Sequence, residues 1–316
     1  TVFDNIRPNP RFEDMVEASK LFNENKCDFI IGAGGGSPID SAKMIRLMTT
    51  NDIDTCLTEP MKNNDIKSLY IPTTAGTGAE VTKSSVFYIN EKDKMSIANL
   101  DFLPDYVILD SSLLNTLPLY QRKVTSLDAL CHSIESYWSV KATDESREYA
   151  KKGILGFFEN KNGYIKNTPD GNEGMLWASY YGGKAINITG TTAAHAMCYN
   201  ITMNCSVSHG HSVACDLSVI WEYMMKHLNK TNGGLTGKEI MKRFDEIGVL
   251  CGGKNAEDGL KIFNRVLSDF DLAFPKTDEK NIPLFVSKVD VTRLGNNPVK
   301  LDSDDLTAIY TEIFRR

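Results

Sequence analysis

The sequence predicts a two-domain protein, with an α/β domain over residues 1–117 followed by an all-helical domain over residues 118–316. A chain of 316 residues is longer than one small domain needs, so two are expected. Before Pro118, short apolar runs alternate with helical patterns, which is typical of an α/β domain. After Pro118, strand-like runs stop and helical periodicity continues to the end of the chain.

The composition is that of an ordinary globular protein, with 41% hydrophobic and 24% charged residues. The net charge of −6 and the lack of a basic run argue against nucleic acid or an anionic membrane surface as a partner. No apolar stretch approaches the roughly 18 residues of a membrane span. The seven cysteines show no framework spacing, so we expect free thiols in a reducing cytoplasm.

A helix, a strand and a glycine turn open the predicted α/β domain. Residues 13–25 are amphipathic, and the apolar run at 27–31 suits a buried parallel strand. In the glycine-rich segment that follows, residues 32–40, we expect Ser37 as the helix N-cap, Pro38 as the first helical residue and Asp40 closing a capping box. A glycine turn at a helix N-terminus binds phosphate through free backbone N–H groups. The pattern is neither G-x-G-x-x-G nor a P-loop, so a turn without a ligand is the alternative.

A second strand, at 68–71, leads into a loop of small and hydroxyl residues at 72–80. The hydroxyls of Thr73, Thr74 and Thr77 suit a phosphate or a ribose, although a polar loop without a ligand is an equally good interpretation. Two such loops after parallel strands match the position of ligands in open sheets. Further strands are expected at 86–89 and 106–109, with Lys94 between them as an ordinarily solvated side chain.

The strongest chemical motif is a carboxylate and an imidazole placed four residues apart. Residues 119–140 lack Pro and Gly and repeat apolar residues at helical spacing, which predicts a helix. Asp128 and His132 therefore project from one face of this helix. This pair is half of a metal site.

The other half of such a site must come from elsewhere in the chain. His195 lies in a predicted helix at 193–204, and His209 and His211 open the next helix. These histidines lie among small and apolar residues, where an unpaired imidazole would be costly. Together with Asp128 and His132, His195 and one of His209 or His211 make a set of three nitrogens and one carboxylate for a divalent cation. Hydrogen-bonded structural histidines are the alternative.

Five motifs follow one another along nearly the whole chain. They are Gly34-Gly-Gly-Ser-Pro-Ile-Asp40, Pro72-Thr-Thr-Ala-Gly-Thr-Gly-Ala-Glu80, Asp128-Ala-Leu-Cys-His-Ser-Ile-Glu135, the spacing from His195 to His209, and Arg293-Leu-Gly-Asn-Asn-Pro-Val299. In order and in approximate spacing, the set resembles the iron-dependent (group III) alcohol dehydrogenases. The resemblance implies a dehydroquinate synthase-like architecture, in which a Rossmann-like N-terminal domain and an all-helical metal-binding domain flank a cleft.

The resemblance also implies a site. The metal ligands would be Asp128, His132, His195 and His209, holding Fe²⁺ or, as an alternative, Zn²⁺. NAD or NADP would lie on a set of N-terminal residues, namely Gly35, Gly36, Ser37, Thr73, Thr74, Thr77, Val86 and Lys94. The implied reaction is hydride transfer between nicotinamide and a small aldehyde or alcohol. We expect a cytoplasmic protein that forms a homo-oligomer, namely a dimer.

Three departures from the family pattern change these expectations. The first βαβ piece, which normally reads the adenosine ribose, is absent from this sequence, so NAD and NADP are not distinguished. Many members carry a His four residues after the third ligand, whereas this chain has Tyr199, so a proton relay would use Tyr199 or solvent. The additional His211 resembles the branch that includes phosphonoacetaldehyde reductases. In that interpretation His211 binds phosphonate or transfers a proton, with a structural role beside the metal ligands as the alternative.

Two rival functions stand beside the dehydrogenase. A lyase or cyclase of the dehydroquinate synthase-like type binds nucleotide and metal on the same scaffold, but those relatives place Glu at the first ligand position, where this chain has Asp128. A non-catalytic metal- or nucleotide-binding protein is the second rival, and only the missing first piece favours it.

Overall fold

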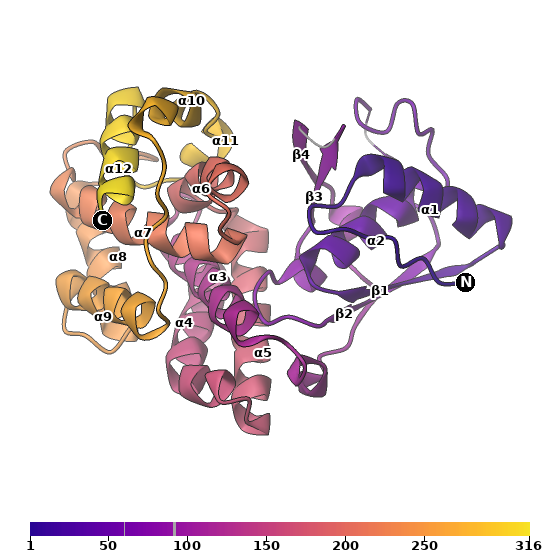
Figure 1. Cartoon of the computed structure of the whole chain (residues 1–316), viewed down its shortest axis with the longest axis horizontal. Helices are drawn as coiled ribbons and strands as arrows, with labels where there is room; N and C mark the ends of the chain where they lie inside the picture. Colours follow the sequence, from indigo (N-terminus) through magenta and orange to yellow (C-terminus); the bar gives the residue numbers. More distant parts are fainter. Residues whose placement is uncertain (60, 91–92) are drawn as a thin grey trace.

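The computed structural model describes residues 1–59, 61–90 and 93–316. Figure 1 shows two bodies side by side, with the strands and the indigo helices on one side and the remaining helices on the other. The chain begins in the first body and ends in the second. Among the described residues, no helix is both long and apolar enough to cross a membrane.

The N-terminal body is built on a small parallel sheet. Strands β1 (Phe29–Gly34), β2 (Lys67–Pro72) and β5 (Tyr106–Val107) pair in the order β1-β2-β5, and both pairings are parallel. Helices α1 (Phe12–Glu24) and α2 (Gly36–Met48) and the short turns η1 (Ala79–Val81), η2 (Leu100–Phe102) and η3 (Ser111–Leu114) complete it. The expected order of helix, strand, glycine turn and helix is therefore present.

Strand β1 differs from its prediction in position and burial. It begins two residues later than expected and runs into the glycine turn, and its side chains alternate between exposed and buried. Ile30 packs in the N-terminal core, whereas Ile31 is 58% exposed. A fully buried strand was predicted because apolar residues fill both faces of this segment, but only one face is covered by the described residues.

A second sheet was not predicted. Strands β3 (Ser84–Ile89) and β4 (Asp93–Ala98) form an antiparallel pair, and Lys94 lies in β4 opposite Tyr88. The side chains of β4 are exposed or partly exposed, and its sequence Asp-Lys-Met-Ser-Ile-Ala mixes polar and apolar residues, so the apolar pattern that indicates a buried strand is weak there. The pairing carries Lys94 from an expected surface loop to the rim of the site described below.

The predicted N-cap of α2 is wrong. Its helix begins at Gly36 with Gly35 as the N-cap, no side chain caps it, and Pro38 is its third residue. The Asp40 carboxylate accepts hydrogen bonds from Lys43 Nζ (3.0 Å) and from the backbone N–H of Val86 (3.0 Å) instead. Asp40 therefore ties α2 to β3 and leaves the first N–H groups of α2 uncapped by any described side chain.

The C-terminal body is all-helical among the described residues. Its helices are α3 (Leu119–Trp138), α4 (Asp144–Ile165), α5 (Pro169–Thr189), α6 (Ala193–Asn204), α7 (His209–Lys226), α8 (Gly237–Leu250), α9 (Ala256–Asp269), η4 (Glu279–Asn281), α10 (Ile282–Ser287), α11 (Val291–Leu294) and α12 (Ser303–Arg315). Capping boxes start α4, α8 and α12, and Pro169 starts α5. The helix predicted over 119–140 is confirmed, whereas α4 was not predicted.

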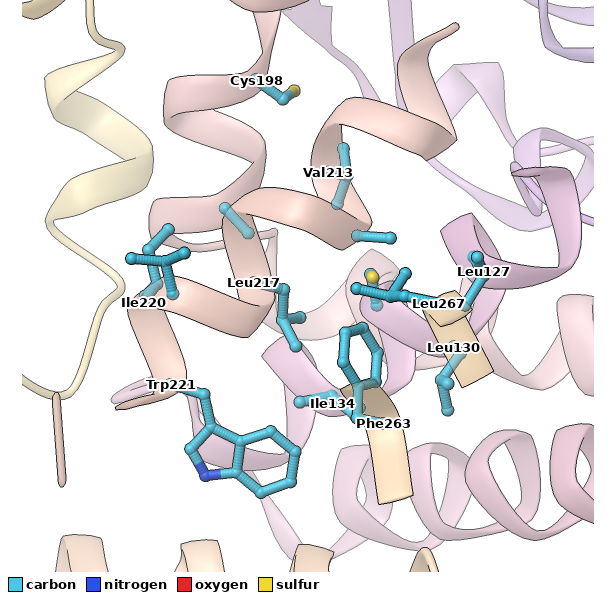
Figure 2. Packing of buried hydrophobic residues seen from close by; sticks show 14 of the residues in the cluster. Leu127, Leu130, Ile134, Cys198, Val213, Leu217, Ile220, Trp221, Phe263 and Leu267 are labelled. Carbon is cyan, nitrogen blue, oxygen red and sulfur yellow. The ribbon is translucent and has the colours of Figure 1, made fainter. Parts of the chain in front are cut away.

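The core of this body holds the site-bearing helices rigidly. Figure 2 shows Leu127, Leu130 and Ile134 of α3 meeting side chains of α7 and α9, among them Leu217 and Phe263. These residues are almost completely buried. Because close-packed interiors resist displacement, α3 and α7 present their polar residues to the site at a fixed spacing.

The two bodies touch where the 72–80 loop meets α5. Gly78 has φ 59°, and a Cβ atom there would clash with Cα of Gly183 in α5. Nearby, the backbone N–H of Lys83 donates to Oδ1 of Asn187 at 2.8 Å. Only a residue without a side chain permits this close backbone approach.

Replacing Gly78 with alanine is therefore expected to lower the free energy of unfolding by about 1–3 kcal/mol, from left-handed strain and overpacking together. Gly234→Ala is the matched control, since Gly234 also has a positive φ (76°) but a Cβ atom there would meet nothing within 4 Å. Urea denaturation of both variants measures the difference. Equal losses of unfolding free energy in the two variants would show that the close contact between Gly78 and α5 adds nothing to stability.

Candidate metal and dinucleotide site

Three imidazoles of the C-terminal body converge on one carboxylate oxygen, that of Asp128. Asp128 and His132 project from α3, one turn apart, while His195 lies in the first turn of α6 and His209 begins α7. The Nε2 atoms of His195, His209 and His132 lie 3.3, 3.8 and 3.9 Å from Oδ1 of Asp128. Asp128, His195 and His209 each offer a ligand atom within 4.8 Å of the others. The structure thus brings three of the four predicted ligands into one mutual set, and His132 lies beside them, its ring centre 4.5 Å from that of His195 in a stacked arrangement.

The charges in this cluster suit a cation. Burial raises the pKa of Asp128, but His132, His195 and His209 outweigh it and hold that pKa below its usual range. Burial lowers the pKa of His132 to about 4 and that of His209 to about 3. Two neutral imidazoles therefore face an ionised carboxylate, and metal ligands must be in these states. Lone pairs aimed at a carboxylate oxygen repel unless a proton or a cation lies between them, so the donor set fits a divalent metal.

Glu135 fixes the orientation of His195. It lies one turn beyond His132 on α3 and is completely buried. Its Oε2 bonds to Nδ1 of His195, so the Nε2 of that ring faces Asp128. Burial lowers the pKa of His195, but Glu135 and Asp128 more than offset this and raise it to about 9, so a metal that binds here must displace the proton from Nε2. A carboxylate behind a ligating histidine sets its tautomer and its direction.

Glu135 also caps the helix that carries His195. Its Oε1 accepts hydrogen bonds from the backbone N–H groups of Thr192 (3.0 Å) and Ala194 (3.0 Å) and from the Thr192 hydroxyl (2.7 Å). The sequence motif contains Glu135, but the pattern alone assigned it no role. The signal was present, because Asp128 and Glu135 are seven residues apart and share a helix face.

One cavity joins this cluster to the glycine turn of α2. Its volume is about 310 Å³, and residues of both bodies line it. From the N-terminal body come five of the predicted dinucleotide residues and Asp40; the five are Gly36, Ser37, Thr77, Val86 and Lys94. From the C-terminal body come Asp128, His132, His195, Tyr199 and His209, together with Thr191 and Arg293, whose roles the sequence did not reveal.

The remaining predicted dinucleotide residues lie next to the cavity without lining it. A Cβ at Gly35 would be 3.5 Å from the Thr74 side chain, and the backbone N–H of Thr73 donates to the Gly34 carbonyl at 2.8 Å. At Gly36, a Cβ would approach the Thr77 side chain to 3.1 Å. The two loops therefore meet at the N-terminus of α2, and the absence of side chains at Gly35 and Gly36 leaves backbone N–H groups open to an anion.

His211 lies outside the cavity. Its Nε2 donates to the carbonyl of Ala273 at 2.8 Å, and its Nδ1 accepts from the Tyr120 hydroxyl at 3.2 Å. Both ring nitrogens are thus engaged by the helical body. This geometry agrees with the structural alternative for His211, and it gives no support to a role in binding phosphonate or transferring a proton.

Fold and site together define a two-domain class in which a glycine turn faces an Asp/His cluster across one cavity. Two family models match the chain: "Iron-containing alcohol dehydrogenase" over residues 1–111 and the C-terminal "Fe-containing alcohol dehydrogenase family" over residues 123–314. The NADPH-dependent butanol dehydrogenase of Clostridium saccharobutylicum is 26% identical, covering 99% of this chain and 83% of that protein. The lactaldehyde reductase of Escherichia coli K12 is 25% identical, covering 98% of this chain and 83% of that protein.

A solved structure gives the same result. The iron-containing alcohol dehydrogenase of Thermotoga maritima superposes with a TM-score of 0.85 at 25% identity, covering all of this chain and 83% of that one. The chain belongs to the iron-containing alcohol dehydrogenase family. The protein is accordingly an NAD(P)-linked oxidoreductase that acts on CH–OH groups, and its family uses Fe²⁺. The predicted family, fold class, enzyme class and cofactors are confirmed.

Proposed function

We propose that this protein interconverts a short aldehyde and its alcohol in the cavity between residues 1–117 and 118–316, the two domains we assign. The observation that carries the proposal is the convergence of four ligand-type side chains opposite the open N-terminus of α2. Hydride transfer needs the nicotinamide and the carbonyl in one water-poor space. This cavity is lined both by residues at the start of α2 and by the Asp/His cluster.

Asp128, His132, His195 and His209 would hold the divalent metal. When bound there, Fe²⁺ supplies Lewis-acid polarisation of a carbonyl and lowers the pKa of an alcohol. Glu135 keeps the His195 ring turned so that Nε2 faces the other donors. The ionised Asp128 supplies the negative charge that favours a cation over a proton at this place.

The dinucleotide would occupy the other end of the cavity. The uncapped N–H groups of α2 and the nearby hydroxyls of Ser37 and Thr77 suit its phosphates. Val86 contributes an apolar side chain and Lys94 an amine to the wall of the same cavity.

Tyr199 stands where many family members carry a histidine. The centre of its ring lies 5.4 Å from that of His209, and the two rings stack. Burial raises the pKa of Tyr199 above its usual range, so the hydroxyl stays protonated. We assign proton delivery to this O–H group or to solvent. A tyrosine held protonated donates hydrogen bonds and does not act as a base near neutral pH.

Two finer predictions join the proposal. Cytoplasmic location is supported by the seven cysteines, all of which are unpaired in the described structure. A homodimer is proposed on the family resemblance. Phosphonoacetaldehyde as the substrate stays a prediction that rests on the resemblance.

The test is anaerobic oxidation of NADH and of NADPH by the Fe²⁺-loaded protein, with propanal and phosphonoacetaldehyde as substrates. We expect stoichiometric loss of reduced nicotinamide absorbance and formation of the matching alcohol. No oxidation with any carbonyl would favour the rival lyase or cyclase, or a non-catalytic binding role.

A further inference from the structure

Arg293 is a cation built into the wall of the cavity. It lies in α11, and its side chain is 19% exposed. Its Nε donates to Oδ2 of Asp290 at 2.9 Å, and its Nη1 donates to the Thr191 hydroxyl at 2.6 Å. Its Nη2 has no hydrogen-bond partner among the described residues. The guanidinium is therefore held firmly on one side and keeps one donor edge free.

A second basic side chain, Lys94, lies close to Arg293. Lys94 Nζ sits over one face of the Tyr199 ring, and the Arg293 guanidinium lies 5.4 Å from the centre of that ring. The ring also stacks on His209. The guanidinium of Arg293 and the amine of Lys94 thus both lie against the aromatic residue that stacks on His209, one of the proposed metal ligands.

Asp290 is the ion-pair partner of Arg293, whereas none of the described carboxylates around the cavity forms an ion pair with Lys94. Asp128 is engaged by the three histidines, and Asp40 by Lys43 and the Val86 N–H. Burial, and next the repulsion from Arg293, lower the pKa of Lys94 well below its usual range. An anion entering the cavity beside Arg293 and Lys94 would relieve this repulsion.

We propose that Arg293 is a specificity-determining residue that binds an anionic group on the substrate. This inference rests on the proposed function and names its substrate class: a short aldehyde that carries a sulfonate, phosphonate or carboxylate close to the carbonyl. An arginine fork bonds such planar or tetrahedral oxyanions through two parallel N–H groups. Arg293 is well placed for this role, because its guanidinium and His209 both lie against the ring of Tyr199.

A dinucleotide phosphate is the competing anion. The phosphate-binding elements of the cavity belong to the N-terminal body, at the start of α2. Arg293 instead bonds Thr191, just before the helix that carries His195. It therefore belongs to the substrate end, and its replacement is expected to leave the KM values for NADH and NADPH unchanged.

The experiment compares sulfoacetaldehyde with its neutral isostere tert-butylacetaldehyde, using the Fe²⁺-loaded native protein, Arg293→Gln and Arg293→Lys. Arg265→Gln, which removes an exposed positive charge on α9, is the control. We expect the native protein to prefer the anionic aldehyde. Arg293→Gln should raise the KM for sulfoacetaldehyde by about 10- to 100-fold and leave the KM for the neutral aldehyde unchanged. The KM of Arg293→Lys for sulfoacetaldehyde should lie between those of the native protein and Arg293→Gln. The KM values of Arg265→Gln should match those of the native protein.

A binding measurement separates failure of this inference from failure of the proposed function. Isethionate, the alcohol product of sulfoacetaldehyde, should raise the melting temperature of the native protein but not that of Arg293→Gln, even if no aldehyde is reduced. Reduction of the neutral aldehyde without preference for the anionic one would overturn the inference and leave the dehydrogenase intact. A thermal shift that persists in Arg293→Gln, or equal changes in both KM values, would also overturn it.

Discussion

Replacing His195 with alanine is expected to abolish turnover while leaving dinucleotide binding largely intact. His195 lies closest to Asp128 among the three imidazoles, and its Nε2 is the donor that Glu135 aims. In the proposed assignment its removal takes away one metal ligand, and losing several kcal/mol of Lewis-acid assistance corresponds to a fall in kcat/KM on the order of a thousandfold or more. The glycine turn of α2 belongs to the other body and does not contact His195 in the described structure.

Steady-state kinetics and NADH fluorescence measure the two halves of this prediction. His227→Ala is the control, because His227 caps the far end of α7 and its Nδ1 bonds to the Tyr223 carbonyl at 2.8 Å, away from the cavity. Its kinetics should match those of the native protein. Parallel loss of turnover and of dinucleotide binding in His195→Ala would contradict the division of labour between the two bodies.

Replacing Glu135 with glutamine is expected to weaken metal binding by about 10- to 100-fold. Glutamine can keep an oxygen toward the N–H groups of Thr192 and Ala194, but then it turns an NH₂ group toward Nδ1 of His195. A donor facing Nδ1 makes that nitrogen an acceptor and moves the ring proton to Nε2. An Nε2–H group pointing at Asp128 has no lone pair to offer a metal.

The measurement is competition for Fe²⁺ or Zn²⁺ against a chromophoric chelator, followed by thermal unfolding of the metal-free variants. Glu159→Gln, on the exposed side of α4, removes one carboxylate without touching the site. We expect Glu135→Gln to lose metal affinity far more than Glu159→Gln. Unchanged affinity in Glu135→Gln, with only a lower melting temperature, would show that Glu135 acts solely as the cap of α6.

The sequence predicted that the candidate ligand side chains of the helical domain would come together, and the reason is simple. Asp128 and His132 share one helix, so their spacing alone fixes their mutual position. His195 and His209 stand at the starts of two helices in apolar surroundings, where a polar ligand type is conspicuous. The resemblance then singled out His209 over His211, and the structure places His209 in the cavity.

What the sequence did not predict depends on contacts between distant segments. Glu135 bonds residues nearly sixty positions away, and no local pattern shows that its carboxylate meets the start of α6. Asp40 lies three residues after Ser37, which is the spacing of a capping box, but its carboxylate oxygens accept hydrogen bonds from Lys43 and from the Val86 N–H instead. Arg293 has no periodic pattern around it, and only packing brings it beside Tyr199 and Lys94.

The central claim is that Asp128, His132, His195 and His209 together hold one metal ion at the inner end of the cavity. Anomalous diffraction at the iron absorption edge, from crystals of the anaerobically Fe²⁺-loaded protein, tests it most directly. The account predicts a single strong peak in contact with the three Nε2 atoms and the Asp128 carboxylate. A peak at any other place, or none from protein that carries stoichiometric iron, would contradict it.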